Sequence, residues 1–246
     1  PRDILARMMP YVCADGNNDG KRRALLSMTG ADEIETFDVF HGLLYGPPAN
    51  GLHRLHIRLP QDARETKLEV PALTLAQRQA FITAPDYRGA DAVWQWTMRP
   101  DGIAVLRMDS WGLYNSSWDW SAWLNDRLDS LNGAKGLIVD IRENEGGLDC
   151  GYIILARIAG RDIYKPQAER LVRYAKTPAH LNPYLDTWDN DFRDWKNQIA
   201  AKDARFFRLT GGTAARISGA GLKKLSVPMA VLITAQNSSA TFQFAS

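Results

Sequence analysis

The sequence predicts an α/β fold with a layered core, because apolar strand-like runs alternate with helix-like segments in its second half. Residues 92–98 and 102–108 are apolar runs on either side of an Asp-Gly pair at residues 101–102, which predicts a β-hairpin. Two further strand-like runs, 136–141 and 227–234, are each followed by a helix-like segment. This alternation predicts parallel strand pairing, with any ligand site beyond the carboxyl ends of the strands.

The helices expected in this half are defined by capping residues and apolar spacing. Ser116 or Ser117 is suited to cap a helix that runs to about Leu131 and carries its tryptophans and leucines on one side. A second, apolar helix is expected over about residues 147–158. The spaced aromatic residues of 181–207 predict a third helix, and the small, polar residues that follow it predict a loop.

The first 90 residues are expected to form a smaller, mainly helical module with short strands, ahead of a core over residues 91–246. Helices are predicted over residues 3–9 and 31–45, and strands over residues 55–59 and 66–73. The connection that follows contains Pro85 and Gly89 and has little periodicity, so we place the module boundary near residue 90.

An acidic, glycine-containing segment near the N-terminus matches the first half of a calcium loop. Asp15, Asn17 and Asp19 stand at alternate positions, and Gly20 takes the place of the sharp turn. The twelfth position of such a loop requires a bidentate glutamate, and here it is Leu26. A polar turn is therefore the favoured interpretation.

Composition narrows the functional classes. The 246 residues carry a net charge of +2 without a basic block, so nucleic acid is not an expected partner. No apolar run approaches the roughly 20 residues of a membrane span. The two cysteines, Cys13 and Cys150, form no disulfide framework, and the scattered histidines predict neither a metal site nor a cofactor. The start at Pro1 and the end at Ser246, inside a helix-like segment, indicate part of a longer protein.

The ends of two predicted strands carry the parts of an acyl-transfer site. Ser239 follows the strand 227–234 at the start of a helix, where its hydroxyl is suited to attack a carbonyl and the N–H of Ala240 to bind the resulting oxyanion. Gly146 or Gly147, after the strand 136–141, is a candidate for the second backbone donor. The alternative is that Ser238 or Ser239 only caps the helix.

These motifs resemble peptidase family S41, the C-terminal processing or tail-specific proteases and their relatives, which include the tricorn core. The family pattern is Asp-Leu-Arg-x-Asn-x-Gly-Gly followed, after an apolar strand, by Ser-Ala-(Ser/Ala/Gly)-Glu. Here residues 140–147 read Asp-Ile-Arg-Glu-Asn-Glu-Gly-Gly and residues 239–241 read Ser-Ala-Thr. The resemblance covers about residues 92–246.

The resemblance implies a ClpP/crotonase-like α/β core and a serine peptidase that acts on a peptide or protein substrate. It implies Ser239 as nucleophile, with oxyanion donors at Ala240 and in the turn of Gly146 and Gly147. It also implies a periplasmic or secreted location. Many members carry a PDZ-like module upstream, and residues 1–90 would then be a remnant of it, because they lack an obvious carboxylate-binding loop.

Three departures from the family pattern leave the activity open. Phe242 replaces the acidic residue after Ser-Ala-x, and Glu143 and Glu145 replace small residues near the glycine pair. Carboxylates at an oxyanion hole would oppose negative charge, so we expect both glutamates to face outward. The family's usual base, a lysine downstream of the nucleophile, lies beyond Ser246.

Candidates for the base within the chain are few. Lys223 and Lys224 precede the nucleophile strand in a polar loop, where a solvated lysine is the ordinary case. His41, His53 or His56 would serve, as histidine does in a tricorn-like arrangement, only if the N-terminal module folds over the core.

Two other functional classes compete with the peptidase interpretation. A catalytically inactive S41-like protein that binds peptides or other ligands is favoured by Phe242 and by the missing base. A crotonase-like acyl-CoA enzyme shares the fold type, but the sequence gives it no support. The G-x-S-x-G elbow of an α/β-hydrolase is absent.

Overall fold

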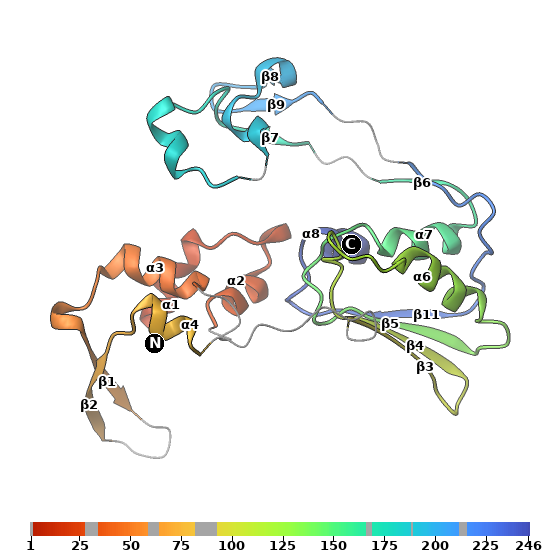
Figure 1. The fold of residues 1–246 in the computed structure, drawn as a ribbon, viewed down its shortest axis with the longest axis horizontal. Coiled ribbons are helices and arrows are strands. Elements are labelled where there is room, and N and C mark those ends of the chain that lie inside the picture. The colour runs from red at the N-terminus through yellow and green to blue at the C-terminus, as the bar shows by residue number, and fades with distance from the viewer. Residues whose placement is uncertain are drawn as a thin grey trace. The chain divides into compact units, whose positions relative to one another are not determined.

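The computed structural model describes residues 2–27, 34–58, 64–81, 93–165, 169–187, 189–211 and 216–246 (Figure 1). The chain divides into two compact units. Unit 1 comprises Pro1–Tyr152 with Ser226–Ser246, and unit 2 comprises Ile153–Leu225. Helices and strands are mixed along the chain, as the predicted α/β class requires. The predicted module boundary near residue 90 lies outside the described residues and stays a prediction.

A four-stranded sheet with the order β11-β5-β4-β3 carries the candidate site of unit 1. Its strands are β3 (Trp94–Met98), β4 (Ile103–Met108), β5 (Gly136–Asp140) and β11 (Met229–Leu232). The predicted hairpin is confirmed, since β3 and β4 pair antiparallel with Trp94 opposite Met108. The predicted parallel pairing is confirmed as well, because β5 runs parallel to both β4 and β11.

The burial pattern of the strands shows why these residues form a sheet. Along β4 the alternate residues Ala104, Leu106 and Met108 are fully buried, as expected for a strand with one face in the core. Four of the five residues of β5 are buried, which is the pattern of a strand covered on both faces. The carboxyl ends of β5 and β11 therefore lie side by side at one edge of the sheet.

Helix α6 (Trp120–Asp129) connects β4 to β5, as a parallel crossover requires (Figure 1). Its N-cap is Asp119, whose carboxylate accepts a hydrogen bond from the N–H of Ala122 at 2.9 Å. The prediction of Ser116 or Ser117 as the cap was wrong, because Ser116 closes a local turn by accepting the N–H of Trp118 instead.

A cluster of tryptophans joins this helix to the sheet. Trp94 of β3 is buried and packs edge-on against Trp118 and Trp120, with ring centroids 5.0 and 5.9 Å apart. Its indole N–H donates to the carbonyl of Ser110 at 2.8 Å, so the buried ring keeps a partner for its polar atom.

The N-terminal part of unit 1 consists of short helices and one hairpin. In chain order these are α1 (Arg2–Met8), η1 (Met9–Tyr11), η2 (Asp15–Asn17), α2 (Asp19–Leu25), α3 (Thr36–Tyr45), η3 (Ala49–Gly51), β1 (Leu52–Arg58), β2 (Glu65–Pro71) and α4 (Leu75–Gln79). Met8, Val12 and Leu26 form a small buried core, against which Phe37 and Phe40 of α3 pack. Strands β1 and β2 lie close to the two strands predicted in this region, and they pair antiparallel with each other.

Unit 2 begins within α7 (Gly151–Ala159) and otherwise contains short elements. These are β6 (Ile163–Tyr164), β7 (Leu171–Val172), η4 (Ala179–Tyr184), η5 (Asn190–Arg193), η6 (Lys196–Gln198), β8 (Ile199–Ala201), β9 (Phe207–Leu209) and β10 (Arg216–Ile217). Strands β7, β9 and β8 form one antiparallel sheet, and β6 pairs with β10.

The predicted aromatic helix over residues 181–207 was wrong, because the stretch forms three 3-10 turns and two short strands. Aspartate side chains close these turns locally. Asp189 accepts the N–H of Asp191 at 2.9 Å, and Asp194 accepts the N–H of Lys196 at 3.1 Å. Such bonds compete with the helical ladder. Trp195 is buried and packs against Phe192, with ring centroids 5.1 Å apart.

Within the described ranges, every helix is too short or too polar to cross a bilayer.

Candidate active site

The first half of the site is a turn at residues 141–147, which follows β5 and is called the glycine turn below. It starts at Asp140, whose carboxylate accepts hydrogen bonds from the Arg142 side chain at 2.9 and 2.7 Å. These bonds from Arg142 lower the pKa of the Asp140 carboxyl, although burial acts in the opposite direction. The pair fixes the direction in which the chain leaves the strand.

Asn144 holds the centre of the glycine turn together. Its side chain is fully buried, donates to the carbonyl of Met108 at 2.8 Å and accepts the N–H of Gly146 at 2.9 Å. The motif asparagine therefore links the end of β4 to the glycine pair. The bond to the Met108 carbonyl is buried and the bond from the Gly146 N–H is partly buried, so removal of the amide would leave the carbonyl without a partner away from water.

The glycine pair is required by backbone geometry. Gly146 and Gly147 have φ values of 107° and 133°, in the region that favours glycine. A Cβ on Gly147 would lie 2.1 Å from the carbonyl oxygen of Trp111. That carbonyl accepts the N–H of Leu148 at 2.8 Å, so it has no freedom to move away.

The second half of the site is the segment 233–239, which follows β11 and ends at the first residue of α8 (Ser239–Ala245); we call it the nucleophile loop after the role predicted for Ser239. Asn237 is buried and donates to the carbonyls of Ile141 and Asn144, at 2.5 and 2.9 Å. Thr241 adds a hydrogen bond to the same Asn144 carbonyl at 3.0 Å. The glycine turn and the nucleophile loop are thus joined by buried, uncharged side chains.

Ser239 lies at the first residue of α8 with a φ of 51°, a left-handed conformation that is uncommon outside glycine. The side chain is exposed, and within the described residues its hydroxyl has no hydrogen-bond partner. Ser238, in contrast, is the N-cap, and its hydroxyl donates to the carbonyl of Glu145 at 2.8 Å. The two adjacent serines therefore have different roles, and Ser239 has the free hydroxyl.

The glycine turn and the start of α8 place backbone N–H groups near Ser239. A Cβ built on Gly146 would lie 3.0 Å from the Cβ of Ser239 and 3.2 Å from the nitrogen of Ala240, so the glycine turn lies directly against the nucleophile. The N–H of Gly146 is already bound by Asn144. Among the described residues, the N–H groups of Gly147 and Ala240 have no hydrogen-bond acceptor. Both are free to bind an oxyanion.

The segment 15–21 of the N-terminal part contacts the nucleophile loop, which sequence reasoning did not anticipate. The Asp15 carboxylate accepts the N–H of Ser239 at 2.7 Å, and the Lys21 ammonium donates to the carbonyl of Gln236 at 2.9 Å. Asp19 instead pairs with Arg22, so the carboxylates proposed for a calcium loop have different protein partners. The predicted polar turn is confirmed as η2, with Gly16 at a φ of 58°.

The three histidines considered as candidate bases have their described contacts within the N-terminal part of unit 1. His41 stacks on Phe37 and contacts His53, with ring centroids 5.5 and 5.7 Å apart. His56 is exposed on β1, as its alternation predicts. Within the described part of the chain, none of these histidines forms a hydrogen bond to the nucleophile loop.

Lys223 and Lys224 belong to unit 2. There the carbonyl of Lys223 accepts a hydrogen bond from Arg157 at 3.3 Å. The side chain of Lys224 lies beside Gly160, since a Cβ on that glycine would be 2.9 Å from the lysine Cδ.

The three residues that depart from the family pattern, Glu143, Glu145 and Phe242, have the following exposure and contacts. Glu143 and Glu145 are exposed, which confirms the expectation that they face outward. Glu145 forms an ion pair with Lys21 at 2.8 Å, and the ring of Phe242 packs on Gly16.

Cysteine chemistry at this edge of the sheet is disfavoured. Cys150 lies just beyond the glycine turn and is fully buried, and burial raises the pKa of its thiol to about 12. It is therefore a neutral, inert core residue at physiological pH. Nowhere in the described ranges do three or more His, Cys, Asp or Glu side chains gather as a metal site would require.

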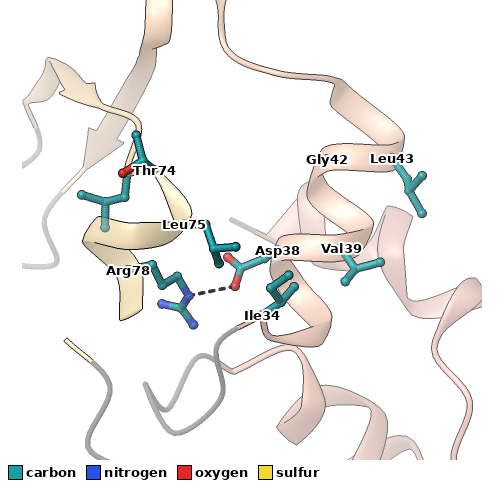
Figure 2. Close-up of a pocket in the computed structure, with 9 residues that line it drawn as sticks. Ile34, Asp38, Val39, Gly42, Leu43, Thr74, Leu75 and Arg78 are labelled. Carbon is teal, nitrogen blue, oxygen red and sulfur yellow. Dashed lines mark ion pairs between the residues drawn. The ribbon is translucent and has the colours of Figure 1, made fainter. Parts of the chain in front are cut away.

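An apolar cavity lies away from these loops, between α3 and α4, and has a volume of about 550 Å³ (Figure 2). Its walls are apolar, with Val39, Leu43 and Leu75 among the lining residues. The one cation in its lining, Arg78, is ion-paired with Glu35 and Asp38 at 3.3 and 3.2 Å. With its charges paired internally, this cavity offers no nucleophile or oxyanion donor comparable to those at Ser239.

Comparison with known proteins identifies the family of the chain. The family model of peptidase family S41 matches residues 102–246, which is more than half of the chain and includes both the glycine turn and the nucleophile loop. The chain therefore belongs to peptidase family S41, as the motifs predicted. No curated protein matches the chain.

Solved structures with similarity to the chain include a predicted peptidase from Parabacteroides merdae ATCC 43184, at 20% identity and a TM-score of 0.39, covering 65% of this chain and 42% of that one. Mature CPAF complexed with lactacystin is 18% identical with a TM-score of 0.28, covering 70% and 38%. Mature CPAF alone is 20% identical with a TM-score of 0.25, covering 50% and 31%. The chain spans less than half the length of each.

Proposed function

We propose that this chain is a serine peptidase of family S41 that hydrolyses peptide bonds through Ser239. The observation that carries the proposal is the free, exposed hydroxyl of Ser239, held in a left-handed backbone conformation beside the glycine turn. Strained backbone at an exposed serine is a feature of nucleophiles. The proposal is also supported by the family match, because the region that matches peptidase family S41 includes Ser239.

The chemistry follows from the groups around the hydroxyl. Ser239 Oγ attacks the carbonyl carbon of the scissile peptide bond, and its proton passes through a base to the leaving amine. The carbonyl oxygen becomes an oxyanion bound by the N–H of Ala240 and a second donor in the glycine turn. Because the N–H of Gly146 is occupied by Asn144, Gly147 is the favoured second donor. Water then hydrolyses the ester on Ser239.

The proposed core type, domain division, substrate class and location also rest on the resemblance to this family. We propose a ClpP/crotonase-like core over residues 91–246, supported by the parallel strands β4, β5 and β11, and a separate N-terminal module over residues 1–90. The substrate class is a peptide or protein. A periplasmic or secreted location is proposed from the resemblance alone.

The proposal is tested by reacting the natural full-length protein with a fluorophosphonate probe and locating the adduct by mass spectrometry. The adduct is expected on Ser239 and not on Ser238, whose hydroxyl is engaged by Glu145. Ser239→Ala removes the nucleophile and is expected to lower peptide hydrolysis about 10⁴-fold or more. Ser239→Gly removes the hydroxyl while tolerating the positive φ, so it separates loss of the nucleophile from backbone strain.

Thermal unfolding of both variants provides the control for folding. A folded wild-type protein that takes up no probe contradicts the proposal. It would favour instead a peptide- or ligand-binding protein built on a peptidase fold.

A further inference from the structure

The segment 15–21 contacts the backbone of the nucleophile at its first residue. The Asp15 carboxylate accepts the N–H of Ser239 at 2.7 Å, across 224 positions of sequence. This N–H belongs to the residue with a φ of 51°. A hydrogen bond to it stabilises the left-handed conformation, which an L-residue adopts at a cost.

The same segment is anchored at its other end by a buried cation. The Lys21 side chain is 5% exposed, and its ammonium donates to the Gln236 carbonyl at 2.9 Å and to Glu145 Oε1 at 2.8 Å. Gln236 belongs to the nucleophile loop and Glu145 to the glycine turn. One ammonium therefore connects both halves of the site, and a buried lysine requires such partners.

Close packing between these anchors leaves no room for larger residues. A Cβ on Gly16 would lie 2.6 Å from the Phe242 ring, and a Cβ on Gly20 would lie 2.9 Å from the Cβ of Ala235. Asn18 adds a hydrogen bond to the Ala235 carbonyl at 3.4 Å. The glycines thus allow the segment to approach both the nucleophile loop and α8.

The contacts explain two of the departures from the family pattern. Phe242, in place of an acidic residue, provides the apolar surface under Gly16, and Glu145, in place of a small residue, provides the anion for Lys21. Two of the three site residues that differ from the family, Phe242 and Glu145, are therefore contacted by the segment.

We infer that Asp15 and Lys21 are positioning residues of this peptidase: Lys21 fixes the segment 15–21 on both halves of the site, and Asp15 holds the backbone of Ser239. The inference rests on the proposed function of Ser239. Asp15 binds a backbone N–H and leaves both the Ser239 hydroxyl and the Ala240 N–H without a partner among the described residues. The segment therefore supports the nucleophile without occupying its reactive atoms.

The test measures the second-order rate of fluorophosphonate labelling for Asp15→Ala, Asp15→Asn and Lys21→Met in the full-length protein. Asp15→Ala loses the acceptor and is expected to slow labelling about tenfold, the effect of one ordinary hydrogen bond. Asp15→Asn keeps an oxygen acceptor and removes a negative charge near the oxyanion, so it is expected to equal or exceed the wild-type rate. Lys21→Met is expected to slow labelling by about the same factor as Asp15→Ala.

Asp19→Asn is the matched control, because it removes the same charge four positions away, where the carboxylate pairs with Arg22. Its labelling rate is expected to be unchanged. Faster labelling of Asp15→Ala would overturn the inference, because the segment would then inhibit the nucleophile. Equal rates for all variants would also overturn it.

Hydrogen exchange of peptides that cover residues 233–242 gives a readout independent of activity. Exchange is expected to rise about tenfold in Asp15→Ala and Lys21→Met and to stay unchanged in Asp19→Asn. If the wild type is not labelled at Ser239, the proposed function fails, and exchange alone decides the positioning role. Unchanged exchange in all three variants would then overturn it.

Discussion

The nucleophile loop is held from two sides by different kinds of contact. Toward the glycine turn it is bound by buried, neutral groups, chiefly Asn237 and the carbonyl of Asn144. Toward the segment 15–21 it is bound by the charged residues Asp15 and Lys21, whose partners are exposed or only partly buried. The contacts with the glycine turn are made by neutral groups, and the contacts with the segment 15–21 are made by charged ones.

The difference indicates that the two sets of contacts have different effects, one on folding stability and the other on the reactivity of Ser239. Hydrogen bonds made by buried side-chain amides are costly to break, because the polar groups left behind then have neither a protein partner nor water to bind. Ion pairs with one exposed partner contribute less to stability and are screened by salt. We therefore expect substitutions in the glycine turn to affect folding, and substitutions in the segment 15–21 to affect mainly the reactivity of Ser239.

The largest effect on stability is expected for Gly147→Ala. The new Cβ would lie 2.1 Å from the Trp111 carbonyl oxygen, and the φ of 133° is unfavourable for alanine. Strain and overpacking together predict a loss of about 4 kcal/mol in the free energy of unfolding, measured by urea denaturation. Gly133→Ala is the matched control, since Gly133 also has a positive φ, 79°, but nothing lies within 4 Å of its added Cβ.

Gly133→Ala is expected to cost about 1 kcal/mol, from the backbone conformation alone. Equal losses for the two glycine variants would show that the close approach to Trp111 contributes nothing.

Asn144→Ala is expected to be the next most damaging change. It removes the partners of the buried Met108 carbonyl and of the partly buried Gly146 N–H, and predicts a loss of about 3 kcal/mol. Fluorophosphonate labelling should fall in the fraction that remains folded, because the glycine turn beside Ser239 is then no longer held by the Asn144 side chain. Asn115→Ala, at an exposed turn, should change the unfolding free energy by less than about 0.5 kcal/mol. Similar stabilities of the two variants would contradict the role of the buried amide.

The neutral side of the site was predictable from the sequence, and the charged side was not. The glycine turn, the hairpin and the strand before Ser239 follow from local patterns of apolar residues, an Asp-Gly pair and glycines. The contact of Asp15 with Ser239 joins residues 224 positions apart, and no local pattern encodes it. The acidic spacing that suggested calcium is explained by separate partners for Asp15 and Asp19.

The errors in the remaining elements have local causes. Aspartate and asparagine compete with helical hydrogen bonds, so aromatic spacing over residues 181–207 did not produce a helix. A short carboxylate that accepts a backbone N–H also makes a helix N-cap, and Asp119, not a serine, takes that position in α6. Asn237 could have been suspected, because asparagine between a strand and a helix is a common turn residue, and in the structure it accepts the N–H of Thr234.

The smallest effect is expected at Asp140, which forms an ion pair with Arg142 where the chain enters the glycine turn. Arg142 lowers the pKa of this carboxyl in the folded protein, so the ion pair stabilises the fold above the unfolded pKa of about 3.9. The contribution is lost as the pH falls through the lower folded value. Because the Arg142 side chain is 53% exposed, we expect only about 0.5–1 kcal/mol.

Urea unfolding of wild type and Asp140→Asn between pH 3 and pH 7 measures this contribution, with the difference in unfolding free energy constant above about pH 5 and shrinking below about pH 4. Asp101→Asn, which breaks the exposed pair with Arg99 in the hairpin, serves as the control and should show a smaller difference. A difference for Asp140→Asn that does not change with pH would mean that the ion pair is not what holds the start of the glycine turn. In that case the neutral amides of Asn144 and Asn237 would be sufficient to fix it, and charge would act on this site only from the side of the segment 15–21.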